Sequence, residues 1–230
     1  MKIGLVLLNF NEIDALPTFL ANLQTEGFHS IFAVDGGSTD GSKELLLSKG
    51  FDVISQKARG RGDAFKIAFS KASTLSLDSL VFISTDGNES SKDLPQMMDA
   101  LVRGYDLVIG SRMIDGARNE EDDQIFRPRK LANKIFAQIA YLRFASGMPK
   151  ITDPINGYRA ITMNAWDRIA LDFNGYDVEY AMSIQAYRHR LNVYEFPTIE
   201  MDRIGGESGA KAIPTSIALL KVLWRLRKKF

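Results

Sequence analysis

Short apolar runs and stretches with helical spacing alternate through the first half of the chain. The apolar runs have the length and composition of strands, and they cover residues 3–10, 30–34, 51–55, 79–84 and 105–111. The helical stretches between them cover residues 12–27, 38–50, the second half of 58–73, and 92–104. Strands that alternate with helices at this pitch predict an α/β fold, with a wound, mostly parallel central sheet flanked by helices.

The pattern changes after residue 113. The acidic, glycine-containing segment 114–124 is expected to be a mobile loop. The rest of the chain predicts a helix, a turn leading into a short strand, a second helix, a late strand, a loop and a final helix. These cover residues 129–147, 152–162, 176–190, 192–204, 205–212 and 213–230.

Polar and glycine-rich motifs follow four of the predicted strands. The motifs are "NFNE", "DGGSTDG", "DGNES" and "GSRM". In wound parallel sheets, ligands bind beyond the carboxyl ends of the strands. The clustering therefore predicts a ligand site at one edge of the sheet, although Asp-Gly and Gly-Asn pairs are also ordinary turn formers.

The composition excludes several kinds of site and partner. A length of 230 residues suits one large α/β domain, or one domain with a small appendage. A chain without cysteine has no disulfides and no thiolate metal sites, which fits a reducing cytosol. A net charge of +1 gives no general affinity for nucleic acid, so no nucleic-acid partner is expected. No apolar run reaches the roughly 18 residues that span a bilayer.

The end of the second predicted strand has features of a phosphate site. Asp35 is followed by Gly36 and Gly37, and residues 38–42 can cap the next helix. The N-terminus of a helix offers N–H groups and partial positive charge, and glycines let a ligand approach the backbone. A capped turn without a ligand is the alternative, since the segment lacks the spacing of a P-loop or of a dinucleotide fold.

Seven motifs occur in a fixed order: "LLNFNE", "VDGGSTDGS", "RGRGDAF", "STDGN", "GSR", "DPINGYRA" and "RIGGES". In this order they resemble the landmarks of family 2 glycosyltransferases, above all those that act on dolichyl and bacterial polyprenyl phosphates. The resemblance covers roughly residues 3–210. It implies a GT-A fold, a nucleotide-diphosphate sugar as donor, a divalent metal and inversion at the anomeric carbon.

On the donor side, the resemblance implies a site for the nucleoside of a GDP- or UDP-sugar at the ends of the first strands. The expected contacts are Asn9, Phe10, Glu12, Asp35, Gly36, Arg61 and Gly87. Many relatives have Asp-Asp-Gly-Ser where this chain has Asp-Gly-Gly-Ser, which leaves the base open.

Asp86-Gly87-Asn88 falls where relatives carry D-x-D. The resemblance implies that Asp86 and Asn88 hold Mg²⁺ or Mn²⁺, which suits oxygen ligands. Because Asn88 has no charge, we expect weak binding of the metal alone and joint binding with the donor diphosphate. A turn without metal is the alternative.

On the acceptor side, Asp153 matches an acid that lies near the acceptor in relatives. A hydroxyl acceptor needs a carboxylate to take its proton, either Asp153 or Glu179. A lipid phosphate is already anionic and needs positioning by cations instead. The cations of this region are Arg112, Arg127, Arg129 and Lys134, although each also fits a solvated helix face. The expected catalytic residues are Asp86, Asp153, Arg127 and Arg129.

A late loop completes the resemblance. Arg203, Gly206 and Ser208 match the R-x-x-G-x-S of relatives, and Lys211 stands two residues beyond the usual place of a lysine. Arg203 and Lys211 are therefore expected to close over the diphosphate, and Ser208 is expected to be a further substrate contact.

The final helix, residues 213–230, is basic and amphipathic. Lys221, Arg225, Lys228 and Lys229 share one side, and apolar residues fill much of the rest. Such a helix can lie in an anionic membrane surface, and packing on the domain with its bases in water is the alternative.

We expect one domain, residues 1–212, with a nucleotide-sugar half (1–113) and an acceptor half (114–212), followed by the helix. The expected location is the cytoplasm, at the cytoplasmic face of the membrane.

The sequence thus predicts an inverting, metal-dependent transfer of a sugar from a nucleotide diphosphate to a polyprenyl phosphate. Transfer to a saccharide or another soluble hydroxyl is an alternative of the same class. An alternative of another class is a non-catalytic subunit that binds nucleotide sugars and has lost its metal site.

Overall fold

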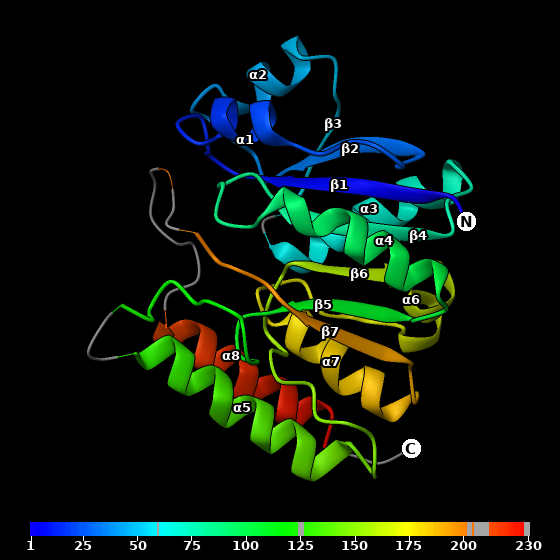
Figure 1. The fold of residues 1–230 in the computed structure, drawn as a ribbon, viewed down its shortest axis with the longest axis vertical. Coiled ribbons are helices and arrows are strands. Elements are labelled where there is room, and N and C mark those ends of the chain that lie inside the picture. The colour runs from blue at the N-terminus through cyan, green and yellow to red at the C-terminus, as the bar shows by residue number, and fades with distance from the viewer. Residues whose placement is uncertain (59, 124–126, 202–203, 205–211, 228–230) are drawn as a thin grey trace.

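The computed structural model describes residues 1–58, 60–123, 127–201, 204 and 212–227. Within these residues one sheet contains the strands β1 (Ile3–Asn9), β2 (Ser30–Asp35), β3 (Asp52–Ser55), β4 (Ser79–Ser84), β5 (Leu107–Ser111), β6 (Arg159–Thr162) and β7 (Val193–Pro197). The helices are α1 (Leu16–Asn22), α2 (Ser42–Ser48), α3 (Arg61–Thr74), α4 (Leu94–Val102), α5 (Pro128–Phe144), α6 (Met163–Ile169), α7 (Val178–Arg188) and α8 (Ala212–Arg225), with a short 3₁₀ turn η1 (Ser91–Asp93). These elements confirm the predicted α/β fold (Figure 1).

The sheet is mixed and mostly parallel, with the strand order β3-β2-β1-β4-β6-β5-β7. β1 pairs in parallel with β2 and β4, and β5 pairs in parallel with β7. β6 is antiparallel to both of its neighbours, β4 and β5. This late strand is therefore inserted between two earlier ones, so residues before and after position 113 share the same sheet.

The parallel register brings the carboxyl ends of three strands together. Asn9 at the end of β1 is aligned with Asp35 at the end of β2, and Leu8 is aligned with Ser84 at the end of β4. Thr85 continues the alignment, since its N–H donates to the carbonyl of Leu8 at 3.1 Å. The polar motifs that follow these strands consequently start from one edge of the sheet.

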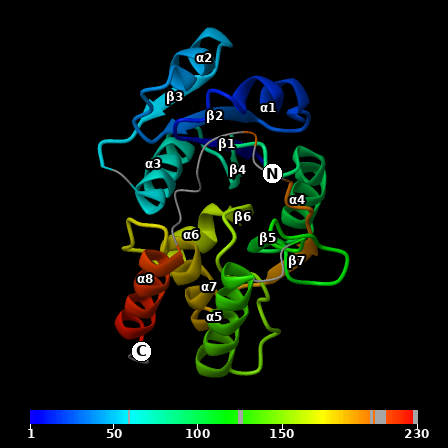
Figure 2. The same cartoon turned by 90° about the vertical axis from the view of Figure 1, so that its left-hand side faces the viewer.

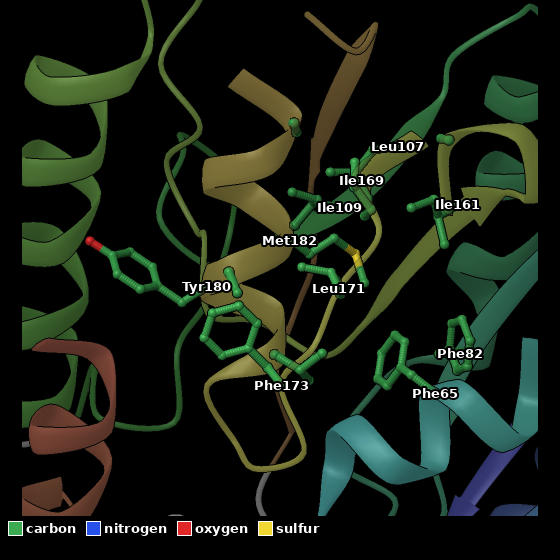
Figure 3. Close-up of a cluster of buried hydrophobic side chains, with 14 of the residues drawn as sticks. Phe65, Phe82, Leu107, Ile109, Ile161, Ile169, Leu171, Phe173, Tyr180 and Met182 are labelled. Carbon is green, nitrogen blue, oxygen red and sulfur yellow. The ribbon is translucent and has the colours of Figure 1, made fainter. Parts of the chain in front are cut away.

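Alternating side chains of the strands enter two hydrophobic clusters, one on each face of the sheet. Val6 and Phe82 belong to the cluster beneath α3, α6 and α7, whereas Leu5 and Val81 belong to the cluster beneath α1 and α4. Figure 2 shows α3 and α4 on opposite sides of the sheet. In the first cluster Phe65 stacks on Phe82 with 4.1 Å between ring centroids (Figure 3).

Among the helices, α6 and α1 differ most from the sequence-based expectation. α6 was not predicted; it begins where the Thr162 hydroxyl accepts a hydrogen bond from the N–H of Ala165 at 3.2 Å, an N-cap within an otherwise short segment. α1 was expected over residues 12–27 and spans only Leu16–Asn22, with a proline in its first turn.

The C-terminal helix α8 packs against α5 and α7. Its Leu219 and Val222 are buried in the hydrophobic core. In the described part of the chain, no helix combines the length and apolar character that crossing a bilayer requires. The division into a domain of residues 1–212 and a separate helix stays a prediction.

Candidate active site

A cavity of about 890 Å³ lies at the carboxyl edge of the sheet. Its lining comes from the ends of β1, β2 and β4, from the segment after β5, and from helices α3, α5, α7 and α8. The edge at which it opens is the one where the sequence predicted a ligand site.

Asn9 and Asp35 lie at the ends of the first two strands and are hydrogen-bonded to each other. The Asn9 amide donates to Asp35 Oδ1 at 2.8 Å and to the Ser42 hydroxyl at 3.1 Å. Asp35 Oδ2 in turn accepts the N–H groups of Gly37 and Ser38, each at 3.0 Å. Asp35 is fully buried and does not line the cavity, so its carboxylate shapes the turn that follows β2.

Phe10, Glu12 and Gly36 line the cavity. Phe10 is 40% exposed, and its aromatic ring suits contact with a planar ligand group. A Cβ atom at Gly36 would lie 3.0 Å from that ring. Glycine at this position therefore makes room for the aromatic side chain.

Arg61 enters the cavity from the start of α3 and forms an ion pair with Glu179 of α7. Burial raises the pKa of Glu179, and the charge of Arg61 opposes that shift. A Cβ at Gly157 would overlap the Arg61 guanidinium, so glycine there makes room for this side chain. Gly62 likewise lets the first turn of α3 meet the backbone of Asn174, whose carbonyl accepts the Gly62 N–H at 3.0 Å.

Asp86 and Asn88 lie on the turn after β4 and line the cavity. Their exposed fractions are 5% and 7%. The Asn88 N–H donates to Asp86 Oδ1 at 3.2 Å, and Gly87 between them has φ +78°, a left-handed conformation that glycine accepts readily. The turn predicted from the sequence is therefore present, and both of its polar side chains reach the site.

The donor atoms of this turn fit Mg²⁺ or Mn²⁺ as a partial ligand set. A carboxylate and an amide oxygen are hard ligands, and Mg²⁺ in proteins commonly takes one or two protein oxygens together with substrate phosphates and water. Among the described residues, no three histidine, cysteine or acidic side chains are grouped to hold a metal by themselves. The turn thus matches an ion whose remaining ligands come from a bound diphosphate.

The balance of charge in the cavity supports the same fit. Within the described lining, acidic groups outnumber the cations: Glu12, Asp86, Glu89, Glu120, Glu179 and Glu200 face Arg61, Arg112 and Arg129. Those of the acids that are ionised would repel an anionic ligand unless further cations joined it. A divalent ion would supply such charge.

Three of these acids, Glu89, Glu120 and Glu200, were not among the predicted site residues; Glu120 lies in the acidic segment 114–124 that was predicted as a loop. Burial raises the pKa of Glu89 to about 7, with Arg61 opposing and Asp86 adding to the shift. Glu89 directly follows Asn88 in sequence, which is the signal that could have indicated it. Glu200 follows an ordinary late strand, and nothing in its local sequence distinguishes it.

Arg112 lies after β5 and is held by Asp153. Arg112 Nε donates to Asp153 Oδ2 at 2.8 Å, and Nη2 donates to Oδ1 at 3.1 Å. The Asn133 amide donates to the same Oδ1 at 2.6 Å. Burial opposes ionisation of Asp153, yet the Arg112 guanidinium holds the pKa of Asp153 below its ordinary value. Because Asp153 is fully buried and does not line the cavity, its contact with the site runs through Arg112 and Asn133.

The cations expected on the acceptor side are placed differently from one another. Arg129 lines the cavity and pairs with Glu120. Arg127 and Lys134 are exposed and do not belong to the described lining, and Arg127 pairs with Asp122 at 3.3 Å. The structure therefore brings Arg112 and Arg129 to the site and leaves the other two outside it.

The predicted late loop cannot be placed. Arg203, Gly206, Ser208 and Lys211 lie outside the described residues, as do Lys228 and Lys229 of the final helix.

Comparison with known proteins identifies a family and several relatives of similar sequence. The family model described as "Glycosyl transferase family 2" matches residues 5–169. A glycosyltransferase of Haloferax volcanii is 27% identical over 197 residues, which are 86% of this chain, and the chain spans only 62% of that relative. An undecaprenyl-phosphate mannosyltransferase of Micrococcus luteus is 28% identical over 218 residues, covering 90% of this chain and 87% of the relative.

Among solved structures, glucosyl-3-phosphoglycerate synthase from Mycobacterium tuberculosis in complex with Mn²⁺ and UDP-glucose has a similar fold. The TM-score is 0.73 with 20% identity, over 97% of this chain and 78% of that chain.

Proposed function

The chain belongs to glycosyl transferase family 2, and from this premise we propose that it transfers a sugar from a nucleotide diphosphate to a polyprenyl phosphate, with inversion at the anomeric carbon. The enzyme class follows from the family. The proposal adds the donor, the metal, the acceptor and the stereochemistry.

One observation carries the proposal. A single cavity joins the turn with Asp86 and Asn88 to helices α5 and α8, through lining residues that include Arg129 and Leu219. A donor diphosphate with its metal ion suits the acidic turn, and a phosphate on an apolar chain suits a basic side chain beside an apolar one. Relatives that match most of this chain include an enzyme named for undecaprenyl phosphate.

We assign the nucleoside of a GDP- or UDP-sugar to the side of Phe10, Glu12 and Gly36. Asn9 and Asp35 support that side by fixing the turn after β2. Asp86 and Asn88 would hold Mg²⁺ or Mn²⁺. When bound there, the ion would supply positive charge to the diphosphate as it leaves the sugar.

The acceptor oxygen of a lipid phosphate is an anion near neutral pH, so it needs orientation more than a base. Arg129 and Arg112 are the described cations on that side of the cavity, and guanidinium groups attract phosphate oxygens. Asp153 then acts as a positioning residue, since it holds Arg112. Arg127, which was predicted to be catalytic, does not line the described cavity, and in this proposal it contributes only positive charge near the site.

The proposal includes contact with a membrane surface. α5 and α8 pack side by side (Figure 1). Both carry large apolar side chains that are about half exposed or more: Leu131, Ile135 and Leu142 on α5, and Ile217, Leu220 and Trp224 on α8. Lys134, Arg143 and Lys221 add positive charge, which anionic lipids attract. We infer that the enzyme acts at the cytoplasmic face of a membrane.

The test has two parts. Thermal unfolding is followed with GDP- and UDP-sugars, each with and without Mn²⁺ or Mg²⁺, and we expect one donor to raise the midpoint only when metal is present. The same radiolabelled donor is then offered with polyprenyl phosphate, and label should enter the organic phase.

Other outcomes separate the alternatives. Transfer of label to soluble saccharides, with none to polyprenyl phosphate, would establish a soluble hydroxyl acceptor. Donor binding that needs no metal and leads to no turnover would establish a binding subunit.

A further inference from the structure

One buried carboxylate, that of Glu200, connects the turn of Asn88 to the segments that follow β5. Glu200 Oε1 accepts the Asn88 amide Nδ2 at 3.2 Å and Arg112 Nη1 at 3.0 Å. Oε2 accepts the Asn119 amide and the N–H of Glu120, each at 3.0 Å. With 7% exposure, this side chain is nearly as buried as a core residue, and four donors satisfy it.

The backbone around Glu200 is fixed by other bonds. The N–H of Met201 donates to the carbonyl of Asn88 at 2.9 Å, and the N–H of Glu200 donates to the carbonyl of Arg118 at 3.0 Å. A change of the Glu200 side chain therefore leaves main-chain bonds that keep this segment beside the turn.

The chemistry of the contact determines how Asn88 faces the cavity. An ionised carboxylate only accepts hydrogen bonds, so the amide nitrogen of Asn88 must point to Glu200. The amide oxygen Oδ1 is then the atom turned away from Glu200, on a side chain that lines the cavity. Oxygen is the atom that a hard divalent cation requires.

The same contact explains why an asparagine stands here. An aspartate at position 88 would place its carboxylate about where the amide is, 3.2 Å from the carboxylate of Glu200. Two negative charges at this distance would repel each other. The side chains at positions 88 and 200 are therefore complementary: the neutral amide of Asn88 lies on the turn, and the carboxylate of Glu200 accepts its hydrogen bond.

We infer that Glu200 is a positioning residue of the metal site. It orients the Asn88 amide so that Oδ1 is presented as a ligand. Its carboxylate also supplies, next to that amide, the negative charge that an aspartate at position 88 would have supplied. The inference rests on the proposed function, in which Asp86 and Asn88 hold a divalent ion. Hydrogen-bond partners behind a ligand typically change metal affinity by about 10–100-fold when removed.

A double-mutant cycle on Mn²⁺ binding tests the inference. Free Mn²⁺ is measured by electron paramagnetic resonance during titration in the presence of UDP, and again with GDP, for the wild type, Asn88→Asp, Glu200→Gln and the double variant. We expect Glu200→Gln to weaken Mn²⁺ binding by at least about tenfold. Asn88→Asp alone should bind no more tightly than the wild type, because the new charge faces Glu200. The double variant should return to within about threefold of the wild type.

The controls separate positioning from a general loss of structure. Asp93→Asn removes another partly buried carboxylate, which accepts a hydrogen bond from Thr198 at 2.6 Å and does not line the cavity, and it should leave Mn²⁺ affinity unchanged. Equal effects of Asn88→Asp in both backgrounds would overturn the inference.

Asn88→Asp also decides the question if Glu200→Gln does not fold. Clearly tighter Mn²⁺ binding by this single variant would show that Glu200 does not oppose a second acid. Absence of Mn²⁺ binding to the wild type with either nucleotide would overturn the proposed metal site itself, and the inference with it. If the wild type binds Mn²⁺ but the effects of Asn88→Asp and Glu200→Gln are simply additive, the inference about Glu200 is wrong while the proposed metal site stands.

Discussion

At the scale of single residues, two acids that were expected to contact substrates instead accept hydrogen bonds from other groups of the protein. Asp35 accepts hydrogen bonds from Asn9, Gly37 and Ser38, and Asp153 accepts them from Arg112 and Asn133. Both are fully buried. A buried carboxylate that accepts several hydrogen bonds holds their donors in place. Their contribution to the site is therefore the orientation of residues that do line the cavity.

Asp86 differs from these two acids because it lines the cavity, so its removal is expected to affect chemistry more than folding. We predict that Asp86→Ala lowers the transfer rate by at least about 100-fold, since loss of a metal ligand removes several kcal/mol of charge stabilisation from the transition state. Transfer rates and the unfolding midpoint are measured together. Asp99→Ala, which removes a mostly exposed carboxylate of α4, is the control and should keep full activity. Full activity of Asp86→Ala would exclude this residue from the mechanism.

At the scale of elements, the acidic segment before α5 fixes the start of that helix. The Glu121 carboxylate accepts the N–H groups of Arg129 at 3.2 Å and Lys130 at 2.9 Å, which satisfies donors that the first turn leaves unpaired. Asp122 pairs with Lys130 and Arg127. Segment 114–124 was predicted as a loop from its composition, and its described part is one, but its buried contacts with α5 were not foreseen.

The ion pairs of Asp122 give a pH-dependent contribution to stability. The hydrogen bond from Lys130 and that from the N–H of Asn119 hold the pKa of Asp122 below its ordinary value of 3.8. A lowered pKa means that the contribution is present above the unfolded pKa and is lost as pH falls through the folded pKa.

We predict that Asp122→Asn lowers the free energy of unfolding by about 0.5–1 kcal/mol at pH 7, because solvent screens pairs of this kind. The difference from the wild type should begin to shrink at about pH 4 and should be lost as the pH falls through the lowered pKa of folded Asp122, below which both chains carry a neutral side chain. Denaturant unfolding across this range measures it. Asp123→Asn is the neighbouring control, since its side chain is 78% exposed. A constant difference from pH 7 to pH 3 would contradict the prediction.

At the scale of the whole molecule, α5 and α8 pack against each other, and residues of both helices line the cavity. Leu220 and Trp224 of α8 are 55% and 65% exposed. Their exposure costs hydrophobic free energy in water that a membrane interface would recover.

We predict that Leu220→Ser with Trp224→Ser weakens binding to anionic phospholipid vesicles by at least about tenfold, since burying each side chain is worth roughly 1.5–3 kcal/mol. Co-sedimentation with vesicles measures the bound fraction. Val102→Ser, at an equally exposed position of α4, should bind like the wild type. Equal binding of all three proteins would place the membrane contact elsewhere or remove it.

Much of the fold followed from the sequence because its signals are local. An apolar run such as residues 79–84 is too short for a helix and too apolar for a loop, and it became β4 without change. The order of strands and helices gave the α/β class, and the polar motifs at the strand ends gave the edge at which the cavity lies. These features depend on neighbours in the chain, so the sequence contains them directly.

Only the tertiary structure decided which polar side chains reach the cavity. The antiparallel insertion of β6 between β4 and β5 depends on pairing partners far apart in sequence. The contact of Glu200 with Asn88 joins residues 112 positions apart, and that of Arg61 with Glu179 crosses between helices α3 and α7. The sequence by itself determined the elements and the chemistry available at their ends. The packing of distant segments determined which of those groups face a ligand, because burial and hydrogen bonding are properties of the assembled fold.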